Sequence, residues 1–160
     1  MEELSKELEE VKQKIADIEK KIEEKKVETG RWKPEEGDGY WFINSYGQTT
    51  HEIWTNNRID KERYEIGNLF KIKKKCEFVV EKLKVIAELR EYEELNREWN
   101  EMNFHYHIYY NYSKEKVDIG CAQIVKQNEI YFESREIARQ VIDAVGENRI
   151  KKYYLGVENE

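Results

Sequence analysis

The sequence predicts an α+β protein, in which an N-terminal coiled-coil helix precedes a small domain of two β-hairpin-plus-helix units. Three observations lead to this prediction: a heptad pattern of apolar residues at the N-terminus, a change of composition beside the only proline, and an order of aromatic strands and amphipathic helices that occurs twice. The expected segments are a charged helix at 1–30, a linker at 31–39, and a domain at 40–157 with approximate repeats at 40–99 and 103–157.

The change of composition separates a charged arm from an aromatic-rich domain. The 160 residues carry a net charge of -6, and 39% of them are charged. Residues 1–36 hold 21 of these charged residues (about 58% of the segment), whereas residues 37–160 hold 41 (about 33%) and nearly all the aromatic residues. Pro34 and the glycines around it are typical of a turn. The remaining domain, of about 120 residues, is long enough to bury a core.

The apolar residues of the arm recur at alternating steps of four and three, which is the spacing of a coiled-coil seam. The β-branched residues Val11 and Ile18 fall at d positions, which argues against a simple dimer and allows trimers or tetramers. We therefore expect self-association through the arm, and packing of the same stripe on the protein's own domain is the open alternative. The predicted oligomerisation residues are Leu4, Leu8, Val11, Ile15, Ile18 and Ile22.

The first unit begins with aromatic and β-branched residues at 40–54, whose central Asn-Ser-Tyr-Gly run predicts a hairpin turn. A helical turn is expected at 59–64. A long helix is expected from Lys73 to about Trp99, because apolar residues there recur at three- and four-residue steps. Its expected core positions are Cys76, Val79 or Val80, Leu83, Ile86 and Ala87.

The second unit repeats this order. Strands are expected at 103–112 and 117–125, and a short third strand is expected at 129–132. Ser134 is a suitable N-cap for a helix that Gly146 ends. One face of the first of these strands is aromatic, and we expect it to be the core face of the sheet, with base stacking as the alternative. That face comprises Phe104, Tyr106, Ile108, Tyr110 and Tyr112.

The two units share a local pattern at the junction between strand and helix. Phe70-x-Ile72-x-x-x-Cys76 aligns with Phe132-x-Ser134-x-x-x-Ala138. The core residues expected nine and thirteen positions after each phenylalanine are Val79 and Leu83 in the first unit, and Val141 and Val145 in the second. Each unit has one apolar sheet face and one helix to cover it, so two units can share a sheet in an α+β sandwich.

The search for catalytic or metal-binding residues gives no convincing set. The two cysteines, Cys76 and Cys121, are expected to be packing residues, and so few cysteines favour a reducing compartment. His105 and His107 lie on one side of a strand, but a metal site would need His51 of the other hairpin to converge on them. No phosphate-binding loop or dinucleotide fingerprint is present. We therefore expect no enzymatic activity, no cofactor and no metal.

Two charged clusters are candidates for binding a partner. Lysines crowd the start of the long helix, where positive charge opposes the helix dipole, so they are suited to an acidic partner. Glutamates at steps of three, three and four residues lie on one face of the same helix and could imitate a row of phosphates. A solvated charged face is the alternative for both clusters. The residues are Lys71, Lys73, Lys74 and Lys75, and Glu88, Glu91, Glu94 and Glu98.

Part of the sequence resembles small proteins encoded by phages and prophages of Firmicutes. The run at 128–156 resembles their C-terminus, and the segments at 37–44, 63–70 and 83–89 resemble their middle. The resemblance covers roughly residues 31–157 and brings no catalytic motif with it. It implies an accessory phage protein, a class that includes inhibitors of bacterial defence systems such as anti-CRISPR proteins.

These observations predict a non-enzymatic phage inhibitor that binds a host defence protein, most specifically an anti-CRISPR acting on a Cas nuclease. The alternatives are a nucleic-acid-binding phage regulator, which would use the lysines and the tyrosine strand, and a small-ligand-binding anti-defence protein. No apolar run approaches the roughly 18 residues of a membrane span, and Met1 leads directly into charged residues, so neither a span nor a signal peptide is expected. The expected location is the cytoplasm of the bacterial host.

Overall fold

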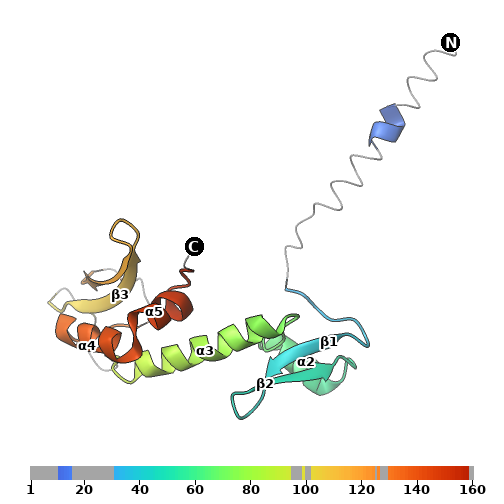
Figure 1. Ribbon diagram of the computed structural model, residues 1–160, viewed down its shortest axis with the longest axis horizontal. Helices are drawn as coiled ribbons and strands as arrows, with labels where there is room; N and C mark the ends of the chain where they lie inside the picture. Colours follow the sequence, from blue (N-terminus) through green and yellow to red (C-terminus); the bar gives the residue numbers. More distant parts are fainter. Residues whose placement is uncertain are drawn as a thin grey trace. The chain divides into compact units, whose positions relative to one another are not determined.

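A computed structural model shows the arrangement of the chain (Figure 1). The residues that it describes are 11–15, 31–94, 99, 102–124, 126 and 130–158. By its contacts the chain divides into two compact parts, Met1–Glu35 and Glu36–Glu160. In the N-terminal part, residues 11–15 are helical, and Val11 and Ile15 are about half exposed. The other predicted seam residues, Leu4, Leu8, Ile18 and Ile22, lie outside the described residues, so the coiled coil stays a prediction.

The C-terminal part, Glu36–Glu160, mixes helices with two small antiparallel sheets, which confirms the predicted α+β class. The strands are β1 (Gly39–Ile43), β2 (Thr49–Ile53), β3 (His105–Asn111) and β4 (Lys116–Ala122). The helices are α2 (Arg58–Glu65), α3 (Lys73–Arg90), α4 (Arg135–Val145), the three-residue α5 (Glu147–Arg149) and the π-helix η1 (Ile150–Tyr154).

The first hairpin, β1–β2, turns where the sequence predicts. The Asn44 side chain accepts hydrogen bonds from the backbone N–H groups of Tyr46 and Gln48, at 2.9 and 3.0 Å. Gly47 has a φ of 71°, a conformation that glycine adopts without strain. Because these turn interactions are local, the sequence alone is sufficient to predict them.

A bridging phenylalanine follows each hairpin and pairs with its first strand. Phe70 exchanges two backbone hydrogen bonds with Trp41 of β1, both of 2.8 Å. Phe132 exchanges two with Tyr106 of β3, of 2.7 and 3.0 Å. The third strand expected at 129–132 is thus a single bridge among the described residues. Each unit therefore leads from its hairpin, through the same pairing, into its helix.

The two hairpins form separate two-stranded sheets, so the expectation that they share a sheet is wrong. Both pack instead on α3, whose 18 residues span about 27 Å. Cys76, near the start of α3, is buried beneath the first hairpin, whose strands both contact α3. Val85 and Leu89, near its end, belong to the core beneath the second hairpin. One helix is therefore long enough to serve both units.

The domain accordingly has two groups of buried apolar residues, one beneath each hairpin. The first group comprises Tyr40, Phe42, Trp54, Leu69 and Cys76. The second and larger group comprises Val85, Leu89, Ile108, Val117, Ile119, Ile130, Phe132, Ala138, Val141, Ile142, Val145 and Ile150.

The expected core face of β3 is confirmed at its centre. Ile108 is buried, and Tyr106 and Tyr110 pack against the same core, whereas Phe104 and Tyr112 at the two ends are exposed. The core covers Ile108, whereas Tyr110 is only partly buried, so base stacking stays a prediction for the end of this face at Tyr110 and Tyr112.

The helix expected at 73–99 differs from α3 in its length and in its core positions. It ends at Arg90, because Glu94 turns away and donates its backbone N–H to the carbonyl of Tyr131, at 2.9 Å. Leu83 is 53% exposed, so its placement in the core is wrong. Val79 and Val80 are only partly buried. The middle of α3 thus carries apolar side chains that neither group of buried residues covers completely.

Helix α4 matches its prediction at both ends. The Ser134 side chain accepts a hydrogen bond from the N–H of Ile137 at 3.2 Å, and Gly146, with a φ of 96°, ends the helix. Val141 and Val145 are buried as expected. The chain then continues through α5 into η1, which contacts α3.

Candidate binding groove on helix α3

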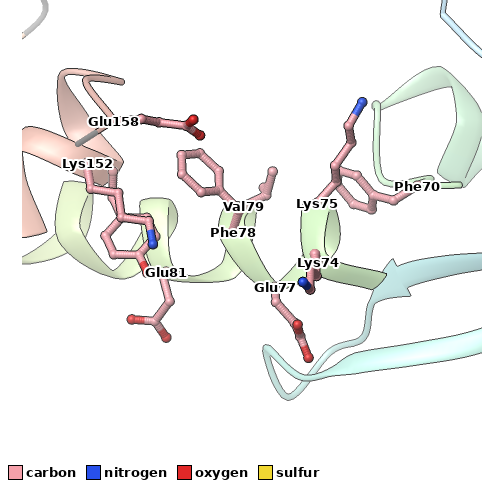
Figure 2. A pocket seen from close by; sticks show the side chains of 10 residues that line it. Phe70, Lys74, Lys75, Glu77, Phe78, Val79, Glu81, Lys152 and Glu158 are labelled. Carbon is pink, nitrogen blue, oxygen red and sulfur yellow. The ribbon is translucent and has the colours of Figure 1, made fainter. Parts of the chain in front are cut away.

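The uncovered middle of α3 forms the floor of a groove of about 710 Å³. The walls come from the bridging residue Phe70 and from the C-terminal segment that includes η1. We call this the α3 groove, and its lining residues are Phe70, Lys74, Lys75, Glu77, Phe78, Val79, Glu81, Lys152, Tyr153 and Glu158. In Figure 2, Phe78 and Lys75 project from the same side of α3, and Glu77 and Glu81 extend toward the opposite edge.

The π-helix η1 supplies the far wall of the groove. The rings of Tyr153 and Phe78 lie 5.1 Å apart, and the Lys152 ammonium lies 5.2 Å from the centre of the Tyr153 ring. π-Helices are rare and are frequent at functional sites. No local sequence pattern marks a π-helix, so this element was not predicted.

The charges around the groove leave an excess of positive charge. Glu77 and Glu81 are each paired within α3, with Lys73 at 3.3 Å and with Lys84 at 2.6 Å. Within the described part of the chain, no ion pair involves the lysines at 74, 75 and 152 or the glutamate at 158. Three lysines and one glutamate therefore remain to interact with an occupant, which favours an acidic one.

The lysines at the start of α3 are placed against the helix dipole, as the sequence predicts. The N-cap residue Ile72 makes no side-chain cap, and the first turn contains no acidic residue. Cations at such a position destabilise a helix, typically by about 0.3–1 kcal/mol each at the surface. Helix stability therefore does not explain these lysines. Lys74 and Lys75 line the groove, whereas Lys73 pairs with Glu77 and lies 5.4 Å from the Trp41 ring.

The predicted glutamate row does not exist as a single helical face. Glu88 makes two 2.8 Å hydrogen bonds with the Arg149 guanidinium, which lower the pKa of the Glu88 carboxyl. Glu91 is the C-cap residue of α3, and Glu94 lies beyond the helix with a buried side chain. Glu98 lies outside the described residues. Glu88 is thus already paired with Arg149 and Glu94 is buried, which argues against these two as phosphate mimics, and the hypothesis stays a prediction.

The histidines and cysteines form no reactive or metal-binding set in the described residues. His105 is buried, with its Nδ1 2.7 Å from Glu94 Oε1 and its ring stacked 3.9 Å from that of Trp99. His107 lies against Gly120, and burial lowers its pKa. No group of three potential ligands that could hold a metal ion occurs in the ranges the structure describes. Burial also raises the pKa of the Cys76 thiol.

Comparisons with protein-family models, with curated proteins and with solved structures find no match to this chain. Among the helices of the described segments, none is long and apolar enough to cross a membrane. The function is therefore inferred from the α3 groove, from the charges around it and from the resemblance noted in the sequence.

Proposed function

We propose that this protein is a non-enzymatic inhibitor that acts by binding another protein, and that the α3 groove is the binding surface. The observation that carries the proposal is the open apolar surface of Phe78, Val79 and Tyr153, bordered by lysines that have no ion pair among the described residues. Exposed apolar surface with a polar rim is typical of a protein-binding site.

The groove favours a partner segment that is both apolar and acidic. An amphipathic helix can lay apolar side chains against Phe78 and Tyr153, whose rings contact each other with their centres 5.1 Å apart, and place carboxylates beside Lys75 and Lys152. Aromatic anchors at the centre of an interface usually contribute most of the affinity, and charges at its rim mainly steer association.

The resemblance to phage proteins supports a narrower proposal. In that context the partner is a bacterial defence protein in the host cytoplasm, most specifically a Cas nuclease, and the chain is an anti-CRISPR protein. Self-association through Leu4, Leu8 and the other seam residues would present several grooves at once and raise the apparent affinity. Sedimentation of the full chain, compared with a chain that starts at Lys33, tests that self-association.

The test compares two doubly substituted variants that change the net charge equally. Lys75→Glu with Lys152→Glu reverses two charges of the groove, and Lys61→Glu with Arg139→Glu reverses two exposed charges outside it. Full-length proteins are assayed for inhibition of purified, guide-loaded Cas nucleases and for binding to them by biolayer interferometry. We expect the groove variant to bind at least about tenfold more weakly and the control variant to bind as the wild type does.

Three outcomes would contradict the proposal in different ways. Equal weakening of both variants would mean that overall charge, and not the groove, governs binding. Tight binding to free DNA or RNA with a steep salt dependence would favour a nucleic-acid-binding regulator instead. Failure to bind any nuclease, combined with groove-dependent capture of another host protein, would remove the anti-CRISPR proposal and leave the binding function in place.

A further inference from the structure

A second groove, of about 530 Å³, lies where the end of α3, the second hairpin and the C-terminal segment meet. Four of its nine lining residues are tyrosines, so we call it the tyrosine groove. Its lining residues are Lys82, Ile86, Ile108, Tyr109, Tyr110, Tyr112, Tyr154, Leu155 and Val157. This volume lies within the roughly 300–1,000 Å³ that is usual for small-molecule sites.

The tyrosines present an aromatic surface to the groove. Tyr110 and Tyr112 make an edge-to-face contact, with ring centres 4.9 Å apart and ring planes at 87°. Tyr112, next to the hairpin turn, is 76% exposed, which leaves much of its ring available to a ligand. Ile86 and Leu155 supply apolar walls. A flat aromatic group therefore has both a stacking surface and an apolar enclosure.

The single charged residue among those that line the tyrosine groove, Lys82, is positive, although the whole chain carries -6. Its lining contains no carboxylate in the part of the chain that the structure describes, and Lys82 makes no ion pair there. The Lys151 ammonium lies 4.9 Å from the centre of the Tyr110 ring, at the same aromatic surface. Two lysines beside this edge-to-face pair of tyrosines favour a ligand that combines an aromatic ring with negative charge.

We infer that the tyrosine groove binds a nucleotide, with the base against the tyrosines and the phosphates at Lys82 and Lys151. Bases stack on aromatic side chains irrespective of sequence, and cationic side chains hold the phosphates. The α3 groove has glutamates at its edge, so the two grooves differ in chemistry. The inference concerns a different surface from the proposed protein-binding function, and either can fail without the other.

The experiment titrates the full-length protein with AMP, GMP, CMP, UMP and ATP by isothermal titration calorimetry, at low and high salt. Adenosine and pyrophosphate, titrated separately, isolate the base and the phosphates. We expect saturable 1:1 binding that is tighter for ATP than for AMP, weaker for adenosine or pyrophosphate alone, and reduced by salt.

Two substitutions, each with a matched control, locate the site. Tyr112→Ala should weaken AMP binding at least about fivefold, and Tyr46→Ala, at the equally exposed tip of the first hairpin, should leave it unchanged. Lys82→Ala should weaken ATP binding more than AMP binding, and Lys61→Ala should affect neither. Thermal unfolding confirms that each variant is folded, and Lys82→Ala decides the question if Tyr112→Ala unfolds.

Several results would overturn the inference. The first is the absence of saturable binding of every nucleotide at millimolar concentration. The second is binding that the Tyr46→Ala control weakens as much as Tyr112→Ala does. The third is binding of single-stranded oligonucleotides without binding of mononucleotides, which would assign a strand-binding surface in place of a nucleotide site.

Discussion

The two hairpins each bury one polar side chain at the same place, but different partners stabilise the two side chains. Tyr40 of β1 and His105 of β3 both immediately precede the residue that pairs with the bridging phenylalanine, and both are almost completely buried. Each also contacts a carboxylate, Asp60 in the first unit and Glu94 in the second. The two units therefore share their backbone pairing and the place where a polar group is buried.

The carboxylate of the first unit belongs to a dense hydrogen-bond network. Tyr40 donates its hydroxyl hydrogen to Asp60 at 2.7 Å, and Asp60 also accepts from the backbone N–H groups of Thr55 at 2.8 Å and Asn57 at 3.3 Å. Burial and the hydrogen bond to Asp60 raise the pKa of Tyr40 to about 12. Burial alone would raise the pKa of Asp60, but its hydrogen bonds lower the pKa overall.

The carboxylate of the second unit comes from a different part of the chain. Glu94 precedes its hairpin and lies just beyond α3, whereas Asp60 follows its hairpin and lies in α2. His105 Nδ1 lies 2.7 Å from Glu94, and Trp99 stacks on the imidazole. An unpaired buried polar group is costly, and in each unit a carboxylate from the segment next to the hairpin lies beside the buried side chain.

The helices of the two units differ in how far their apolar faces are buried. Helix α4 buries its apolar face, including Val145, whereas the equivalent face of α3 at Leu83 is exposed. Because α3 extends across both units, its middle lies between the two groups of buried residues, and there the α3 groove forms.

The largest expected effect breaks the polar network of the first unit. Asp60→Ala should lower the free energy of unfolding by about 3 kcal/mol, because Tyr40 and two backbone N–H groups lose their acceptor. Urea unfolding followed by circular dichroism measures the loss. Asp143→Ala, at an exposed position of α4, is the control and should change stability by less than about 0.5 kcal/mol.

The same network predicts a dependence on pH. The folded-state pKa of Asp60 is lowered, so its contribution is fully present above the unfolded pKa of about 3.9 and is lost as the pH falls through the lower folded value. The wild type should therefore lose stability below about pH 4 more steeply than Asp60→Ala. Parallel curves for the two proteins would contradict this account of the network.

The second prediction compares equivalent helix positions. Val145→Ala should cost about 2 kcal/mol, because it leaves a cavity in the core, and Leu83→Ala should cost less than about 0.5 kcal/mol at its exposed position. Thermal unfolding of both variants measures the difference. Equal costs would mean that Leu83 is covered in solution, and would contradict its exposure on α3.

The third prediction concerns the two N-caps. Ser134→Ala removes the cap of α4 and should cost about 1 kcal/mol. Ile72→Asp adds a cap and a negative charge to the uncapped, lysine-rich start of α3 and should stabilise the fold by about 0.5–1 kcal/mol. Chemical denaturation measures both changes, and the matched exchange Ser134→Thr should be nearly neutral. A destabilising Ile72→Asp would show that Ile72 contributes packing that outweighs a cap.

The smallest expected effect is at the ion pair between Glu88 and Arg149, which links α3 to α5. Both side chains are more than a third exposed, so Glu88→Gln should cost less than about 1 kcal/mol. The pKa of Glu88 is lowered, so the contribution is present at neutral pH and is lost as acid protonates the carboxylate. Denaturation at pH 7 and at pH 3 tests this, with Glu136→Gln at an exposed position of α4 as a control, and a larger cost at pH 3 would contradict the assignment.

Most of the local structure could be predicted from the sequence, because local interactions produce it. The Asn44 turn, the Ser134 cap and the end of α4 at Gly146 each depend on residues within a few positions of one another. The correspondence of Phe70 with Phe132 was visible as spacing, although the backbone bridges that explain it are not. Of the candidate site, the sequence indicated Lys74 and Lys75 and gave no sign of the π-helix that forms the opposite wall.

By itself, the sequence determined the hairpins, the helix starts and the excess of lysine at the start of α3, since propensity, capping and charge are properties of neighbouring residues. Only the tertiary structure decided where α3 ends, which glutamate is buried and which apolar residues remain uncovered. Those outcomes depend on contacts between distant segments, such as Glu94 with Tyr131 and His105, and Phe78 with Tyr153. Periodicity marks an apolar face, but whether a partner covers it depends on how the rest of the chain packs.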